Sequence, residues 1–232
     1  VPVQAAEDNA IVAESLRAMF AAGQADTGSA EANEDLQAIR YIYVVRDFKP
    51  IWVRDSGPKT KAKALLAELK ISGVHGLSPS FYHVADIEAL MGADDPDELA
   101  RLDMLLSGAV VEYGGDLANG HVGRSVAPAE NAVEPVMMTP ARFVAGAEAA
   151  ENLRDFAGAL LNEDYRYVRL IAKLGEFTRI EESGRWPAIN ADGPGIAPGK
   201  RDPRIGNIRT LLMLSGDLPI TDLGGDTLDE GM

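Results

Sequence analysis

The stretch between Asp95 and Gly120 has the strongest helical pattern in the chain, and it constrains the fold more than any other feature. Asp95 can accept hydrogen bonds from the first free backbone N–H groups of a helix, and Pro96 at the first helical position loses no hydrogen bond. Glu98, three residues after this cap, completes a capping-box pattern. The apolar residues that follow recur at steps of three and four, which places them on one face: Leu99, Leu102, Leu106, Val110, Tyr113 and Leu117. Other helices are expected to cover that face.

The opposite side of this helix is predicted to face solvent. Four charged residues fall mostly on that side: Arg101, Asp103, Glu112 and Asp116. The adjacent Gly114 and Gly115 each oppose helix formation by about 1 kcal/mol relative to alanine. The glycine pair therefore predicts either a neighbouring backbone that comes close or a kink.

Shorter apolar stripes predict further helices on both sides of the long one. They span approximately residues 6–22, 34–45, 60–72, 79–91, 140–161 (one helix or a pair), 165–177 and 205–214. No strand pattern of any length is present, and Ser183 to Pro203 is dense in glycine and proline. The sequence thus predicts an all-α fold, an irregular multi-helix scaffold with one long Gly/Pro-rich loop.

Charge and cysteine content exclude several classes of function. The chain has 22 Lys and Arg against 36 Asp and Glu, a net charge of −14, which disfavours binding to nucleic acid or to anionic membranes. There is no run of about 18 apolar residues, so no membrane insertion is expected. Cysteine is absent, which removes disulfides, thiolate metal sites and cysteine nucleophiles.

The ionisable residues form no recognised catalytic motif. The segment from Gly195 to Arg201 lacks the glycine and the Ser or Thr of a phosphate-binding loop. His75, His83 and His121 have no metal-ligand spacing and are interpreted as turn or capping residues. Carboxylates are numerous, so their number leaves a glycosidase-type pair open, and Glu112 is the one to check. The simpler interpretation of Glu112 is that it belongs to an acidic surface.

The Gly/Pro-rich loop contains Trp186, with Arg185 before it and Pro187 after it. A tryptophan on a long loop can stack against a sugar or peptide ligand, but more often it anchors the loop onto helices. Trp186, Arg185 and Tyr113 are the candidate ligand or interdomain contacts. No catalytic residue, cofactor or metal ligand is assigned.

Two parts of the sequence, Ala62 to Val122 and Gly184 to Leu218, carry a resemblance to a known family. Its signature elements are His75 to Tyr82 (His-Gly-Leu-x-Pro-x-x-Tyr), Leu102 to Leu106 (Leu-Asp-x-Leu-Leu), Trp186-Pro187, Gly216 to Leu218 (Gly-Asp-Leu) and Phe48 to Trp52. In this order and spacing, the chain resembles the non-catalytic scaffold of the large multidomain L,D-transpeptidases of Gram-negative bacteria. The resemblance covers most of Tyr41 to Leu218.

The resemblance implies a periplasmic parent enzyme that acts on peptidoglycan. In this family a cysteine nucleophile takes the acyl group from a donor tetrapeptide stem and passes it to an acceptor amine. That cysteine belongs to a Ser-x-Gly-Cys-x-Arg motif that follows a small peptidoglycan-binding module, and neither is present here. No catalytic residue carries over, and the chain alone is expected to be inactive. The expected partners are peptidoglycan, through the parent enzyme, its catalytic domain and other cell-wall synthesis proteins.

The predicted organisation has three parts. Residues 1–40 form an N-terminal helical extension, 41–218 the helical scaffold domain, and 219–232 the start of a linker to a downstream domain. The Val1-Pro2-Val3 start fits a precursor from which a signal peptide has been removed. The alternatives are a stand-alone periplasmic, peptidoglycan-associated adaptor or binding protein and, as a third hypothesis, a carboxylate-based wall hydrolase that uses Glu112.

Overall fold

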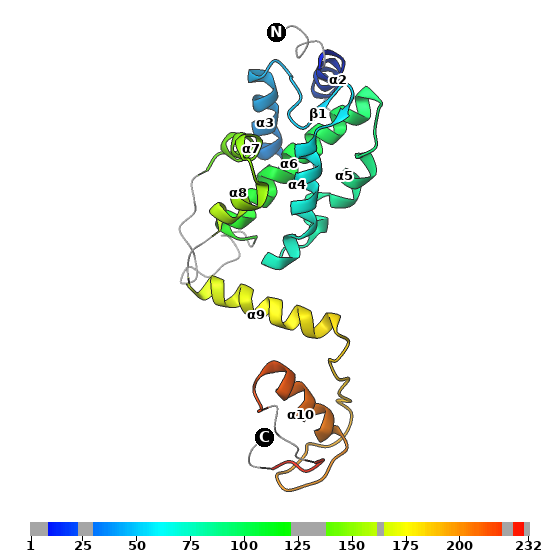
Figure 1. Ribbon diagram of the computed structural model, residues 1–232, viewed down its shortest axis with the longest axis vertical. Coiled ribbons are helices and arrows are strands. Elements are labelled where there is room, and N and C mark those ends of the chain that lie inside the picture. The colour runs from blue at the N-terminus through cyan, green and yellow to red at the C-terminus, as the bar shows by residue number, and fades with distance from the viewer. Residues whose placement is uncertain (1–8, 23–29, 122–137, 162–164, 220–224, 230–232) are drawn as a thin grey trace. The chain divides into compact units, whose positions relative to one another are not determined.

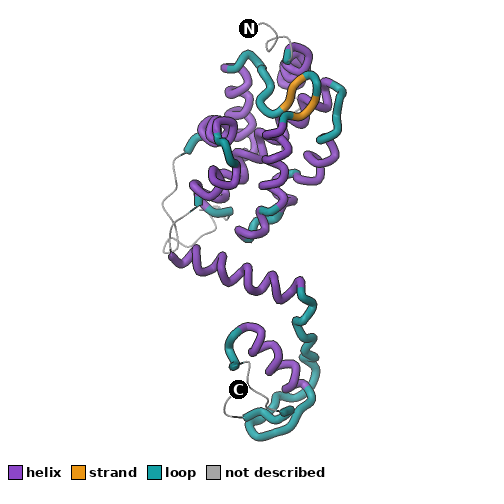
Figure 2. The backbone as a smooth tube through the Cα atoms, in the orientation of Figure 1, coloured by secondary structure: helices purple, strands orange, loops and turns teal. Residues whose placement is uncertain are grey.

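The computed structural model describes residues 9–22, 30–121, 138–161, 165–219 and 225–229 (Figure 1). The chain divides into two compact units, Val1–Asp164 and Tyr165–Met232. Within the described residues, the regular structure is helical apart from one short hairpin and one isolated bridge (Figure 2). The hairpin pairs β1 (Val53–Arg54) antiparallel with β2 (Gly57–Pro58). The all-α prediction is confirmed.

The long helix α6 (Pro96–Asn119) forms the centre of the first unit. Asp95 caps it as predicted, because its Oδ1 accepts from the N–H groups of Asp97 (3.0 Å) and Glu98 (3.2 Å). Gly120, with φ +84°, ends it. The predicted apolar stripe is buried, with no side chain of the six more than 4% exposed.

Among the described residues of the first unit, six α-helices contact α6. They are α2 (Ala10–Ala21), α3 (Ala30–Val45), α4 (Thr60–Lys70), α5 (Val84–Leu90), α7 (Pro140–Ala149) and α8 (Leu153–Leu160). The sequence left one helix or a pair open for residues 140–161, and the structure has the pair α7 and α8. Asn152 caps α8 by accepting from Arg154 N–H at 2.9 Å, whereas Thr139 makes no side-chain capping bond to α7. Because these neighbours cover more than one face of α6, burial extends beyond its apolar stripe, while Arg101 and Glu112 stay exposed.

The N-terminal helix α2 shares the core of this unit. Val12, Leu16 and Phe20 are buried, and the Phe20 ring lies 5.5 Å from that of Tyr43 on α3. The predicted boundary between residues 40 and 41 falls inside α3. Residues on both sides of that boundary therefore contribute to one hydrophobic core.

Two short 3-10 helices, η1 (Ser72–His75) and η2 (Pro79–Tyr82), follow α4. Gly76 joins them in the left-handed conformation, with φ +74°, which a residue without Cβ adopts without strain. Ser72 Oγ donates to the Leu77 carbonyl at 3.0 Å and closes the turn. This turn directs Leu77 and Tyr82 into the core.

The second unit contains α9 (Tyr165–Glu182) and α10 (Arg204–Ser215), and the loop between them is not helical, as predicted. Arg209 of α10 is buried and donates to the carbonyls of Gly225 (3.1 Å) and Thr227 (3.0 Å). Gly199 N–H donates to the Leu228 carbonyl at 2.7 Å. Residues 225–229 are thus bonded to α10 and to the loop within this unit.

Candidate functional site

A buried polar network is centred on Asp103 of α6, which is fully buried. Its Oδ1 accepts hydrogen bonds from the Tyr43 hydroxyl (2.6 Å) and from Ile51 N–H (2.9 Å). Its Oδ2 accepts from the N–H groups of Trp52 (2.6 Å) and Val53 (3.0 Å). Four donors therefore converge on one carboxylate and fix residues 51–53 against the middle of α6.

The prediction that Asp103 faces solvent is wrong. Helical periodicity gives the angle of a residue around the helix axis, but it does not reveal that a second face of the helix is also covered. Ser107, one turn later, is fully buried as well; its Oγ accepts from Trp52 Nε1 at 2.9 Å and shares a 2.8 Å hydrogen bond with the Tyr43 hydroxyl. The one sequence signal for this network was the aspartate within the Leu-Asp-x-Leu-Leu motif.

Burial governs the acid–base properties of this network. Desolvation raises the pKa of the Asp103 carboxyl, while hydrogen bonds from Tyr43 and from the backbone oppose that shift. Desolvation, with the nearby Asp103 charge, also raises the pKa of Tyr43 well above its usual value. Lys59 Nζ donates to the Ile51 carbonyl at 2.7 Å, and partial burial lowers its pKa. Since Asp103, Tyr43 and Ser107 are closed to solvent, the network serves as an anchor and offers no surface to a substrate.

An open groove of about 480 Å³ lies where the second half of α6 meets η2 and the start of α7, and we call it the α6–η2 groove. Its walls include Phe81, Tyr82, Glu112, Asp116, His121 and Phe143. The Tyr82 hydroxyl donates to Asp116 Oδ2 at 2.8 Å, and His121 Nδ1 lies 2.8 Å from the same oxygen. The His121 ring stacks on Phe81, with centroids 4.2 Å apart and planes inclined by 12°. Burial and the Asp116 hydrogen bond raise the pKa of Tyr82, which keeps this hydroxyl a donor.

Glu112 and Asp116 both line the α6–η2 groove, one helical turn apart. A glycosidase pair requires one carboxyl that is held protonated as the acid and a second that is ionised. Asp116 Oδ2 is already engaged by the Tyr82 hydroxyl and by His121 Nδ1, so this oxygen is not open to a substrate. The geometry therefore gives the hydrolase hypothesis no support.

The three histidines lie where turn residues were expected. His75 ends η1, and partial burial lowers its pKa. His83 has φ +51° between η2 and α5 and lies 3.5 Å from Asp86, while His121 follows the end of α6. Among the residues that the structure describes, no three His, Cys, Asp or Glu side chains gather as metal ligands. No described helix has the length and apolar composition needed to span a membrane.

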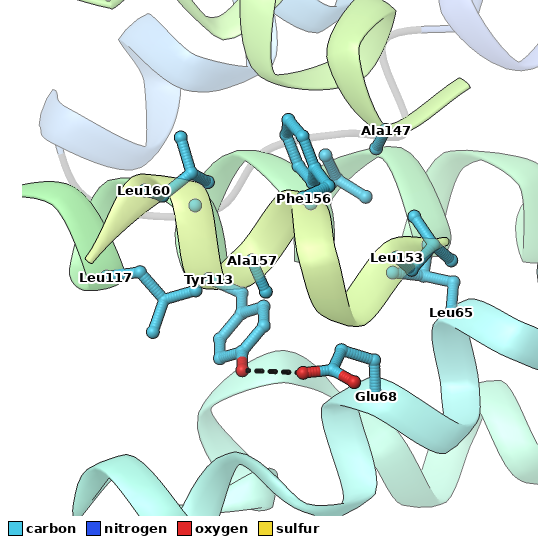
Figure 3. Close-up of a pocket in the computed structure, with 11 residues that line it drawn as sticks. Leu65, Glu68, Tyr113, Leu117, Ala147, Leu153, Phe156, Ala157 and Leu160 are labelled. Carbon is cyan, nitrogen blue, oxygen red and sulfur yellow. Dashed lines mark hydrogen bonds between the residues drawn. The ribbon is translucent and has the colours of Figure 1, made fainter. Parts of the chain in front are cut away.

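Tyr113, one of the three predicted contact residues, lies in a small apolar crevice among α4, α6, α7 and α8 (Figure 3). The space in this crevice is only about 10 Å³, too small for a ligand larger than a water molecule. The Tyr113 hydroxyl donates to Glu68 Oε1 at 3.5 Å, and Glu68 Oε2 lies 3.6 Å from Arg154 Nε. At 4% exposure, Tyr113 is part of the packed core.

Of the two adjacent glycines of α6, Gly114 lies at a close approach between two helices. A Cβ at Gly114 would lie 2.6 Å from Cδ1 of Phe143, so an aromatic ring of α7, and not a backbone, makes the close approach. No atom lies within 4 Å of a Cβ at Gly115. The arrangement recurs at Gly146 of α7, where a Cβ would lie 2.6 Å from Cε2 of Phe156. Two glycines thus let two phenylalanine rings pack between successive helices.

Trp186 and Arg185 lie in the second unit, just after α9. The Trp186 ring packs edge-to-face on Phe177 of α9, with centroids 5.9 Å apart, and is 44% exposed. Arg185 Nε donates to Ser183 Oγ at 3.2 Å. This packing is the loop anchor that the sequence favoured, while contact of Trp186, Arg185 or Tyr113 with a ligand or another domain stays a prediction.

Comparison with known proteins identifies the domain. A family model described as Scaffold domain matches residues 37–174, which include the Asp103 network and the α6–η2 groove. Searches of curated proteins and of solved structures found no match. Because the matched segment is more than half of the 232 residues, the chain belongs to the Scaffold domain family.

Proposed function

We propose that this scaffold domain is the non-catalytic part of a periplasmic L,D-transpeptidase that cross-links peptidoglycan. The main observation behind this proposal is the ordered series of motifs from Phe48 to Leu218, in a chain that belongs to the Scaffold domain family. The chain contains no cysteine, so the acyl transfer would be performed by another domain.

The positions of the motif residues support this proposal. Trp52 and Tyr82 are fully buried, and Asp103 receives four hydrogen bonds from residues of the core. Residues that hold a fold together are the ones that a shared domain must retain. A resemblance that rests on such residues supports common architecture more strongly than one that rests on surface composition.

A scaffold of this kind would act by holding other parts in place. The Asp103 network ties residues 51–53 and α3 to α6, and the bidentate Arg46–Glu148 pair, at 2.9 and 2.7 Å, ties the end of α3 to α7. These long-range bonds limit relative movement of the helices. A rigid support positions a catalytic domain against its substrate better than a flexible one.

The first test is the natural reading frame together with an assay of the chain. We expect the gene to encode a cysteine-containing catalytic domain on the same polypeptide, and the 232-residue chain to form no cross-link between tetrapeptide muropeptides in a mass-spectrometric assay. A frame that encodes no such domain would support the stand-alone peptidoglycan-associated adaptor instead. Turnover of muropeptides by the chain alone would defeat the proposal.

A second test uses the parent enzyme. Replacement of Asp103 by alanine in the full-length protein should lower the fraction of direct diaminopimelate cross-links, because the support is destabilised while the catalytic cysteine is untouched. An unchanged fraction, with the variant shown to be destabilised, would contradict a supporting role.

A further inference from the structure

We propose that the α6–η2 groove binds an arginine side chain of a partner protein. The inference stands on the groove alone and does not depend on the transpeptidase proposal. It combines three observations: the hydrogen-bonding groups that face the groove, its charge, and its stacked rings.

The groove presents acceptors. Tyr82 and His121 both bond to Oδ2 of Asp116, and no described residue bonds to Asp116 Oδ1. A carboxylate accepts only, so His121 Nδ1 donates to Asp116 Oδ2, and Asp116 Oδ1 remains as an acceptor that faces the groove. The Tyr82 hydroxyl uses its one proton on Asp116. A ligand that fits these groups must bring several N–H donors.

The charge of the groove selects a cation. Glu112 and Asp116 line it, and no lysine or arginine is among its described lining residues. The first unit as a whole has 13 Lys and Arg against 26 Asp and Glu, a net charge of −13. This field attracts a positively charged segment and repels an acidic one.

The stacked rings favour a planar cation. Phe81 is 45% exposed and lies nearly parallel to the His121 ring. A guanidinium can stack on an aromatic face while its N–H fork reaches a neighbouring carboxylate, whereas an ammonium is a compact, strongly hydrated charge. Of the cationic side chains, arginine therefore matches both the rings and Asp116.

The experiment is an NMR titration of the 232-residue chain, in which the His121 and Phe81 ring signals are followed. The probes are the acetylated tripeptide amides Ala-Arg-Ala, Ala-citrulline-Ala and Ala-Lys-Ala, with chitotetraose as a neutral glycan. Citrulline keeps the shape of arginine without its charge. We expect the arginine peptide to bind roughly tenfold more tightly than the citrulline peptide, and more tightly than the lysine peptide, as a cation–π contact plus an exposed ion pair implies.

Matched variants locate the binding. Phe81→Ala and Asp116→Asn should each reduce the affinity for the arginine peptide to the citrulline level. Asp86→Asn is the control, because Asp86 pairs with His83 at 3.5 Å outside the groove. Phe81 is partly exposed, so Phe81→Ala should fold even if Asp116→Asn, which removes a partner of Tyr82, does not.

Several outcomes would overturn the proposal. Equal affinities for the arginine and citrulline peptides would remove the charge argument, and equal affinities for arginine and lysine would remove the planar cation. Equal shifts at His83 and His121 would indicate non-specific attraction to an acidic surface. Tighter binding of chitotetraose than of the arginine peptide would assign the groove to glycan.

Discussion

The Tyr43 hydroxyl donates a 2.6 Å hydrogen bond to the Asp103 carboxylate, although 60 positions separate these residues in the chain. The bond joins α3 to α6 at a fully buried point. The same carboxylate holds residues 51–53, so three separate parts of the chain depend on one side chain. The domain is therefore organised around a polar anchor inside an apolar core.

Removal of the Asp103 carboxylate should be among the most destabilising single changes in this unit. Asp103→Ala leaves three buried backbone N–H groups without an acceptor, while the Tyr43 hydroxyl keeps only Ser107 Oγ and the carbonyl of residue 103. We expect a loss of about 3–5 kcal/mol in the free energy of unfolding. Urea unfolding measures it. Asp97→Ala, at an exposed position of the same helix, is the control and should cost no more than about 1 kcal/mol. A loss below about 1 kcal/mol for Asp103→Ala would show that the network contributes little.

Stability should fall with rising pH in the alkaline range. The pKa values of Tyr43 and Tyr82 are raised in the folded state above the unfolded value of 10.0, mainly by burial. The unfolded chain therefore releases these protons first, and the free energy of unfolding decreases as pH rises above about 10, by about 1.4 kcal/mol per pH unit for each tyrosine.

The variant Tyr43→Phe should reduce this alkaline slope by the share of one tyrosine, measured by urea unfolding between pH 9 and 11. Tyr165→Phe is the control, because Tyr165 is 69% exposed. The pKa of Lys59 is lowered in the folded state, so this residue makes the free energy of unfolding rise with pH. The contribution is the same in the wild type and in both variants, and it cancels when their slopes are compared. Equal slopes for the wild type and Tyr43→Phe would contradict the buried position of this hydroxyl.

Adjacent glycines of α6 should respond to alanine in opposite directions. At Gly114 the new Cβ would lie 2.6 Å from the Phe143 ring, and we expect Gly114→Ala to destabilise the domain by roughly 1–3 kcal/mol. At Gly115 no atom lies within 4 Å, so Gly115→Ala should stabilise it by up to about 1 kcal/mol through helix propensity. Thermal unfolding of both variants tests the pair. A stabilising Gly114→Ala would mean that Phe143 does not pack against Gly114, and a destabilising Gly115→Ala would contradict the open space at Gly115.

The two tryptophans should differ in access to solvent. Trp52 is fully buried and Trp186 is 44% exposed. In Trp186→Phe the remaining fluorescence should resist acrylamide, with a quenching constant several-fold below that of the wild type. Trp52→Phe should retain only the readily quenched component. Strong quenching in Trp186→Phe would place Trp52 at the surface and exclude its hydrogen bond to Ser107.

The helices of this fold could be predicted from the sequence because the signals that begin and end a helix are local. Asp95 and Gly120 marked the ends of α6 correctly, since capping and left-handed conformations depend on adjacent residues. The role of Gly114 could not be predicted in this way, because it depends on a ring of α7 that the chain brings near only on folding.

The candidate groove was only partly foreseeable. Glu112 and His121 were singled out by residue type, but nothing in the sequence indicated that Phe81 and Tyr82 of η2 would meet them. For Tyr113 the sequence held the answer. This residue was a candidate contact residue, but it lies on the apolar stripe of α6 and is buried in the core.

The sequence by itself determined that the chain is helical, where its long helix begins and ends, and that no cysteine is present for acyl transfer. The tertiary structure alone decided that Asp103 is buried, because periodicity places a side chain around an axis and says nothing of what surrounds that axis. It also decided which side chains form the α6–η2 groove, since hydrogen bonds such as Tyr82 to Asp116 join residues whose separation in sequence carries no local signal.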